Sequence, residues 1–143
     1  MLKVGIIGWR GMVGSVLIQR MHEENDFESI DAHFFSTSQS GGKVRILNSQ
    51  ESTLLDAFDA DELTKMDILL SCQGGDYTKR ILHSLREKNW SGHWVDAAST
   101  LRMNSDAMIV LDPINKEAID TAIARGNKNW VGGNCTVSLM LLA

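Results

Sequence analysis

The sequence predicts an α/β protein with a doubly wound, mostly parallel sheet. Short apolar stretches alternate with stretches of helical spacing, a glycine-rich turn joins the first strand to the first helix, and polar or glycine residues follow the later strands. Strands that alternate with helices form parallel sheets covered by helices on both faces. The 143 residues are enough for one domain with its own core, so a Rossmann-like domain is expected.

Composition narrows the class of protein. The chain is 43% hydrophobic and 22% charged, with a formal net charge of −4, as in soluble globular proteins. It has no basic run for a nucleic acid and no apolar stretch of membrane-spanning length. Its two cysteines do not make a disulfide framework, so a cytoplasmic protein is expected.

The first turn is a candidate cofactor site. Leu2–Ile7 is predicted to be a buried strand, and Ser15–Met21 has helical spacing. Between them stand Gly8, Gly11 and Gly14. Glycines at this point permit a sharp turn and a close approach to a pyrophosphate, which the helix N-terminus then receives. The G-x-x-G-x-x-G spacing departs from the usual G-x-G-x-x-G, and the alternative is a turn without a ligand.

The end of the predicted strand Ile30–Phe35 favours NADP over NAD. A cofactor without a 2′-phosphate usually meets a carboxylate here, whereas this strand runs into hydroxyl residues that include Thr37 and Ser38. Their hydroxyls can donate to a 2′-phosphate, and Arg10 of the first turn can supply positive charge. The alternative is that the serine- and glycine-rich loop only makes a turn.

The next region carries weaker signals. Residues 43–52 are polar and predict a loop or a short edge strand. Leu54, Leu55 and Phe58 are spaced to share one helical face, and the acidic residues around them indicate a solvated helix surface. Those carboxylates lack a converging ligand set, so no metal site is predicted.

The later strands bring polar residues to the same sheet edge. Strands are predicted at 67–72, 94–98, 108–113 and 129–131, and helices at 77–88 and 116–125. Gln73 follows the first of these strands, where ligands of open parallel sheets bind. Arg102 follows the second and is a candidate for gripping an anion, the alternative being a surface arginine. Cys72 is expected to be a small core residue.

Cys135 is the candidate nucleophile. It follows two glycines and Asn134 and precedes an apolar run to Leu142, which predicts a tight turn opening into a buried helix. A thiol at a helix N-terminus lies among unpaired N–H groups at the positive end of the helix dipole, which favours the reactive thiolate. The run reaches Ala143 without a capping residue. We therefore expect residues 1–134 to form a cofactor-binding domain and residues 135–143 to begin the catalytic domain of a longer, two-domain protein.

Five motifs, read together, are similar to those of one known family. They are Gly8-Trp9-Arg10-Gly11-Met12-Val13-Gly14, Phe35-Ser36-Thr37-Ser38, Cys72-Gln73-Gly74-Gly75-Asp76-Tyr77, Asp96-Ala97-Ala98-Ser99 with Leu101-Arg102-Met103, and Gly132-Gly133-Asn134-Cys135-Thr136-Val137-Ser138. In this order they resemble bacterial aspartate-semialdehyde dehydrogenase, from the first residues of the chain to the last.

The resemblance implies an activity and a set of site residues. The family reduces β-aspartyl phosphate with NADPH to aspartate β-semialdehyde and phosphate, on the route to lysine, methionine, threonine and diaminopimelate. Cys135, with Asn134 beside it, would form a thioester, and Arg102 would bind the phosphate. NADP would lie against the first turn and two later loops, at Gly8, Arg10, Gly11, Met12, Val13, Gly14, Thr37, Ser38 and Gln73.

The family also has a second domain. That domain supplies the catalytic base histidine, the arginine for the substrate carboxylate and most of the subunit interface. The resemblance therefore implies a homodimer acting on small molecules, and a chain that is inactive without its second domain.

Two alternatives stay open at this point. The first is another acyl-phosphate reductase, such as N-acetylglutamyl-phosphate reductase, which fits the Gly-Asn-Cys-Thr-Val-Ser neighbourhood less well. The second is a non-catalytic NADP-binding module or fragment, in which Cys135 is inert.

Overall fold

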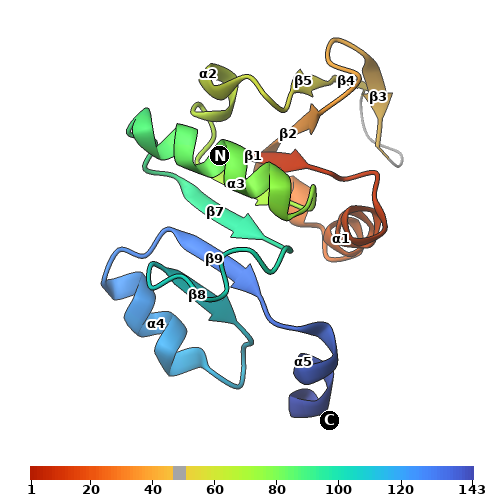
Figure 1. Cartoon of the computed structure of the whole chain (residues 1–143). Coiled ribbons are helices and arrows are strands. Elements are labelled where there is room, and N and C mark those ends of the chain that lie inside the picture. The colour runs from red at the N-terminus through yellow and green to blue at the C-terminus, as the bar shows by residue number, and fades with distance from the viewer. Residues whose placement is uncertain (47–50) are drawn as a thin grey trace.

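Seven strands form one parallel sheet in the computed structural model, which describes residues 1–46 and 51–143 (Figure 1). Its strands are β1 (Leu2–Ile7), β2 (Ile30–Ser36), β5 (Leu55–Asp56), β6 (Ile68–Ser71), β7 (His93–Asp96), β8 (Ala107–Val110) and β9 (Asn129–Gly132). Their order is β5-β2-β1-β6-β7-β9-β8, and every neighbouring pair is parallel. The chain winds outward from β1 in both directions, which confirms the doubly wound, Rossmann-like prediction.

Helices flank this sheet, and a small ribbon lies beside it. The remaining elements are α1 (Met12–Glu23), η1 (Asp26–Glu28), β3 (Lys43–Arg45), β4 (Glu51–Thr53), α2 (Ala60–Leu63), α3 (Gly75–Glu87), α4 (Lys116–Ala124) and α5 (Cys135–Leu142). β3 and β4 pair antiparallel, so the part of the predicted 43–52 loop or edge strand that is described forms a ribbon. Positions 47–50 of that prediction lie outside the described residues.

The two large helices α1 and α3 cover opposite faces of the sheet. Successive side chains of a strand point to opposite faces, and the neighbours Ile6 and Ile7 of β1 accordingly enter different cores. Ile6 packs in the core that contains Ile18 of α1, whereas Ile7 packs in the core that contains Leu85 of α3. Because α1 follows β1 and α3 follows β6, each helix begins at the carboxyl edge of the sheet and runs back toward the opposite edge.

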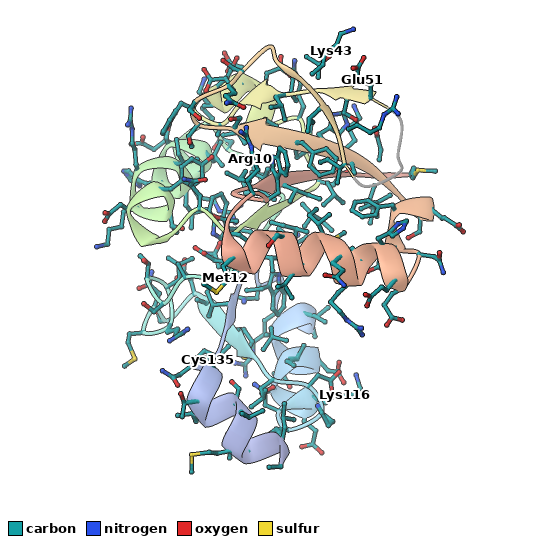
Figure 2. The ribbon with its side chains drawn as sticks, turned by 90° about the vertical axis from the view of Figure 1, so that its right-hand side faces the viewer. Arg10, Met12, Lys43, Glu51, Lys116 and Cys135 are labelled. Atoms are coloured by element: carbon teal, nitrogen blue, oxygen red, sulfur yellow. The ribbon has the colours of Figure 1, made fainter. Side chains whose placement is uncertain are left out.

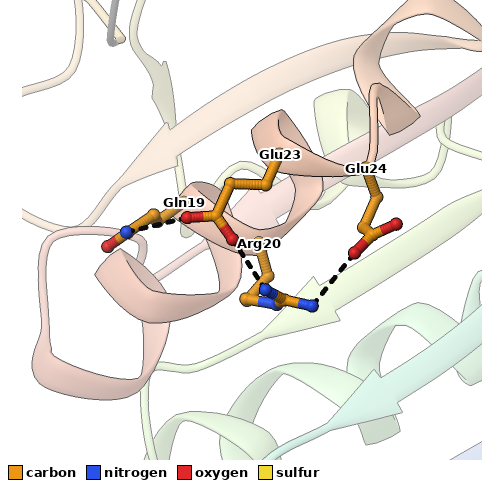
Figure 3. Close-up of polar contacts among 4 residues, drawn as sticks. All are labelled: Gln19, Arg20, Glu23 and Glu24. Carbon is orange, nitrogen blue, oxygen red and sulfur yellow. Dashed lines mark hydrogen bonds and ion pairs between the residues drawn. The ribbon is translucent and has the colours of Figure 1, made fainter.

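The far end of α1 is a solvated surface. Arg20 forms ion pairs with Glu23 at 2.7 Å and with Glu24 at 3.0 Å, and Gln19 donates to Glu23 at 2.9 Å (Figure 3). Exposed pairs one helical turn apart stabilise a helix only slightly, because water and salt screen their charges. These contacts stabilise the last turn of α1 slightly. They lie far from the carboxyl edge of the sheet, where the helix begins.

The helix predicted around Leu54, Leu55 and Phe58 is wrong. Leu55 begins the short strand β5, which pairs with β2 through the register of Phe35 with Leu55. The helix starts later, because the Asp59 side chain accepts hydrogen bonds from the N–H groups of Asp61 and Glu62 and so caps α2. Parallel pairing with β2 overrides the helical spacing of the apolar residues.

Strand β8 is shorter than the predicted strand 108–113. Its ladder ends at Val110 because the Asn115 side chain binds the following backbone on both sides. The Asn115 carboxamide accepts from the N–H of Leu111 at 2.9 Å and donates to the carbonyl oxygen of Ile109 at 2.7 Å. The other predicted strands and helices are confirmed within a few residues, including α4, which ends at Ala124 shortly before Gly126 with its φ of +79°.

The prediction that Cys135 opens into a buried helix is wrong on burial. α5 begins at Cys135 as expected, yet its apolar side chains face solvent: Leu139 is 72% exposed and Met140 75% exposed. The helix extends away from the sheet after β9 (Figure 1), so neither hydrophobic core reaches it.

Candidate active site

The predicted site residues lie in loops that share one edge of the sheet. Because all seven strands are parallel, their carboxyl ends meet at the same edge, where open α/β sheets bind ligands. Figure 2 labels Arg10 and Met12, which follow β1, and Cys135, which follows β9. The fold therefore brings together residues from the first and the last tenth of the chain.

The glycine turn after β1 is tightly packed. Gly8 has a φ of +75°, and a Cβ on it would lie 2.5 Å from the carbonyl carbon of Cys72. A Cβ on Gly14 would collide with the carbonyl oxygen of Gly8. Glycine is thus required at both positions, at Gly8 for the close approach of the turn to the backbone that follows β6 and at Gly14 for the packing of α1 on its own turn.

The N-terminus of α1 is open to a phosphate. Gly11 occupies the cap position and has no side chain, so the cap residue cannot accept from the leading N–H groups of the helix. Met12 is 87% exposed and Val13 56% exposed, which leaves that turn uncovered. Free N–H groups at the positive end of a helix dipole suit a pyrophosphate.

A pocket of about 380 Å³ adjoins this helix end. Six of the nine predicted cofactor residues line it, namely Gly8, Arg10, Gly11, Thr37, Ser38 and Gln73. The other three, Met12, Val13 and Gly14, follow Gly11 in the first turn of α1. Its glycine floor, hydroxyls and guanidinium fit a phosphorylated nucleotide.

Arg10 is held over this pocket by three neighbours. Its Nη1 donates to Gln39 Oε1 at 2.6 Å and its Nη2 to Ser36 Oγ at 3.1 Å. The guanidinium also stacks over the ring of Trp9, with Cζ 4.9 Å from the centroid. Sequence reasoning missed Ser36 and Gln39 as site residues, and the available signal was the serine that ends β2 directly before the hydroxyl loop.

Asn134 and Cys135 open α5 side by side. The Asn134 side chain accepts from the N–H groups of Thr136 at 3.0 Å and Val137 at 3.2 Å, which is an N-cap. Cys135 is the first helical residue and its side chain is exposed. The predicted thiol position at a helix N-terminus is therefore confirmed, and Asn134 fixes where that helix starts.

Arg102 reaches the turn that precedes Cys135. It donates from Nε to the carbonyl oxygen of Gly132 at 2.9 Å and from Nη2 to that of Gly133 at 3.1 Å. Among the described residues, its three other N–H groups have no protein acceptor. The loop after β7 thus supplies a guanidinium beside the cysteine turn, with donors left for an anion.

The loop that carries Arg102 is anchored by a buried carboxylate. Asp96 ends β7 and is 1% exposed. It accepts from the Thr78 hydroxyl at 2.5 Å, the Trp94 indole at 3.1 Å and the Ala98 N–H at 2.8 Å. Three donors stabilise a carboxylate in this interior position, so the start of the loop is fixed.

The second cysteine differs from Cys135 in its surroundings. Cys72 is half-buried and directly follows β6. Burial, and then the negative charge of Asp96, raise the pKa of its thiol. Both effects disfavour the thiolate, which argues against Cys72 as the nucleophile. The expected core position is only partly met, because Cys72 is half-buried and lines the pocket beside the glycine turn.

Residues 1–46 and 51–143 contain neither a metal-binding cluster nor a helix that could span a membrane. Within these ranges, no three His, Cys, Asp or Glu side chains gather closely enough to hold a metal ion. In the same part of the chain, no helix has the length and apolar character needed to cross a membrane.

A parallel sheet whose glycine turn, open helix N-terminus and hydroxyl loop line one pocket defines an NAD(P)-binding Rossmann domain. Residues 3–122 match the family described as "Semialdehyde dehydrogenase, NAD binding domain". The chain belongs to that family.

Solved structures are similar over nearly the whole chain. Aspartate semialdehyde dehydrogenase from Francisella tularensis is 59% identical with a TM-score of 0.95, and the match covers 100% of this chain and 39% of that one. Aspartate semialdehyde dehydrogenase II from Vibrio cholerae, complexed with ASA, is 23% identical with a TM-score of 0.78, covering 99% and 44%. The enzyme from Candida albicans with NADP is 18% identical with a TM-score of 0.69, covering 96% and 44%. The last two show a shared fold, and this chain spans 39% of the first.

Proposed function

We propose that this chain is the NADP-binding and nucleophile-bearing part of an aspartate-semialdehyde dehydrogenase. The observation that carries the proposal is the 59% identity to the Francisella tularensis enzyme over the entire chain. That relative acts on aspartate semialdehyde by name, which favours an aspartyl substrate over an N-acetylglutamyl one. The exposed Cys135 at the start of α5, beside Arg102, supplies chemistry that a non-catalytic module would not need.

NADP is the proposed cofactor. Its pyrophosphate would meet the N-terminus of α1 at Gly11, Met12 and Val13, where the helix lacks a side-chain cap. The 2′-phosphate would meet Arg10, Thr37 and Ser38 in the adjoining pocket, which presents a guanidinium and hydroxyls. Gln73 lies in the wall of the same pocket and would contact the cofactor toward its nicotinamide half. When bound, NADPH supplies a hydride to an acyl carbon.

Cys135 is the proposed nucleophile. Its sulfur attacks the carbonyl carbon of β-aspartyl phosphate, a carbon–sulfur bond forms, and the carbon–oxygen bond to phosphate breaks. The product is a thioester on Cys135 and free phosphate. After reduction, the Cys135 thiohemiacetal loses the sulfur as thiolate and releases aspartate β-semialdehyde. Covalent capture replaces one difficult step with two easier ones, and the backbone N–H groups that open α5 can stabilise the oxyanion.

Arg102 is the proposed phosphate ligand. It contacts the carbonyl oxygens of Gly132 and Gly133, which directly precede Asn134 and the nucleophile Cys135, and keeps three N–H groups for an anion. A guanidinium there would hold the leaving phosphate and, in the reverse direction, the attacking one.

The remaining parts of the proposal concern the whole enzyme. Residues 1–134 form the cofactor domain, and residues 135–143 open the catalytic domain, whose further groups include the base histidine and the arginine for the substrate carboxylate. The enzyme is a cytoplasmic homodimer on the route to lysine, threonine, methionine and diaminopimelate. The chain alone is inactive, because that second domain completes the site.

The test is NADPH formation by the complete protein, with and without phosphate. Aspartate semialdehyde should support phosphate-dependent formation of NADPH, while N-acetylglutamate semialdehyde should not. Equal or greater activity with the acetylated substrate would contradict the substrate assignment, and activity that is independent of phosphate would contradict the acyl-phosphate chemistry.

A further inference from the structure

We infer that Ser36 and Gln39 are positioning residues that set the preference of this domain for the 2′-phosphate of NADP. The inference rests on the proposed cofactor. It concerns two residues that accept hydrogen bonds from Arg10 and so fix its place relative to the loop that carries Thr37 and Ser38.

Ser36 is the hub of this arrangement. It ends β2, it is 7% exposed, and its Oγ accepts from Nη2 of Arg10 at 3.1 Å. The same oxygen accepts from the N–H groups of Ser38 at 3.3 Å and Gln39 at 3.0 Å. One buried hydroxyl therefore joins the first turn to the loop that carries Thr37 and Ser38. Without that hydroxyl, the two would be free to separate.

Gln39 holds the other side of the guanidinium. Its Oε1 accepts from Nη1 of Arg10 at 2.6 Å. Trp9 lies under the same guanidinium, and Trp9 in turn packs edge-on against Phe34, with ring centroids 5.9 Å apart. Arg10 thus stacks on the Trp9 ring and donates to two acceptors at its sides. These contacts fix an otherwise mobile side chain over the pocket.

The charge of these acceptors is the feature that selects a phosphate. Both are neutral, so the guanidinium keeps its full positive charge for the ligand. A carboxylate at position 39 would form a charge-assisted pair with Arg10 and would add a negative charge where a 2′-phosphate should arrive. A 2′-hydroxyl, which carries no charge, would be affected far less. An acidic residue near this point is also the usual sign of a NAD site.

Gln39→Glu in the complete protein tests the inference, with NADPH and NADH dissociation constants measured by cofactor fluorescence. We expect NADPH affinity to fall by about tenfold or more while NADH affinity changes by less than about threefold. The matched control is Gln19→Glu, the same change on the exposed far end of α1 (Figure 3), which should leave both affinities unchanged.

Ser36→Ala is the second variant. Loss of the hub oxygen should weaken NADPH binding more than NADH binding, whereas a merely structural loss would weaken both equally. A wild-type preference for NADPH that Gln39→Glu leaves unaltered would overturn the inference alone. A wild-type protein with no preference for NADPH would contradict the proposed cofactor and overturn the inference with it.

Discussion

Arg102 donates a hydrogen bond from Nε to the carbonyl oxygen of Gly132 across 2.9 Å, although 30 residues separate the two in the sequence. This bond joins the loop after β7 to the last residue of β9, three positions before the exposed Cys135. The proposed anion-binding side chain is therefore tied to the backbone that leads into the proposed nucleophile, and a substitution of Arg102 is expected to change the position of Cys135.

Arg102→Lys should separate charge from geometry. Lysine keeps the positive charge but presents a single ammonium, which cannot hold both carbonyl oxygens and an anion in the planar arrangement of a guanidinium. In the complete protein, we expect kcat/KM for phosphate to fall by about tenfold or more. Arg125→Lys, at the exposed end of α4, is the control and should have little effect. An equal loss in both variants would argue against a special role for Arg102.

The two cysteines should react with iodoacetamide at very different rates. Cys135 is exposed at a helix N-terminus, whereas Cys72 is half-buried and has a raised pKa. We expect one fast thiol, which Cys135→Ser removes and Cys72→Ala leaves in place, as followed by peptide mass spectrometry. Faster labelling of Cys72 would reverse the assignment of nucleophile and core residue.

Gly14→Ala should destabilise the fold, because a methyl group there meets the carbonyl oxygen of Gly8 and the Cα of Trp9. The expected loss in the free energy of unfolding is about 1–3 kcal/mol, as for other overpacked sites. Gly11→Ala, whose Cβ would lie 3.5 Å from the same oxygen, should cost less than about 1 kcal/mol. Urea unfolding with unchanged m-values measures both losses, and equal losses would contradict the close-packing account of the turn.

His93 should make stability depend on pH. Its Nδ1 accepts from the Trp130 indole N–H at 2.9 Å, so this nitrogen is unprotonated in the fold. Burial, followed by the cations of Lys128 and Arg86, lowers the pKa of His93 below its ordinary value of 6.5.

The sign of that dependence follows from proton binding. Below pH 6.5 the unfolded chain binds a proton at this position that the folded chain resists, so stability falls as pH drops through 6.5 toward the lowered folded value. Above pH 6.5 this contribution is fully present. The stability difference between wild type and His93→Gln should therefore shrink from pH 8 to pH 5 in urea unfolding. A difference that stays constant would contradict a neutral His93, and the exposed His83→Gln is the control.

The sequence allowed prediction of features that depend on neighbouring residues. Alternating strands and helices give a parallel sheet, and Asn134 in front of an apolar run gives a helix that starts at Cys135. The same reasoning gave the wrong element at Leu54 and Leu55, because an apolar pair fits a two-residue strand as well as a helix face. Pairing of Leu55 with β2 decides for the strand.

Other features depend on distant partners. Arg10 contacts Ser36 and Gln39 across 26 and 29 positions, which no local spacing reveals. The predicted burial of α5 was wrong because neither core extends to it, although its residues are apolar enough for an interior. Helix formation could be predicted from local sequence, whereas burial depends on what packs against the helix.

The most direct test of the central claim is the mass of the complete protein after it is mixed with β-aspartyl phosphate in the absence of NADPH. We expect an aspartyl group on the peptide that contains Cys135, removed by hydroxylamine and absent in Cys135→Ser, because the thioester forms before reduction. An aspartyl group on Cys72, or turnover without any acylated cysteine, would contradict the account.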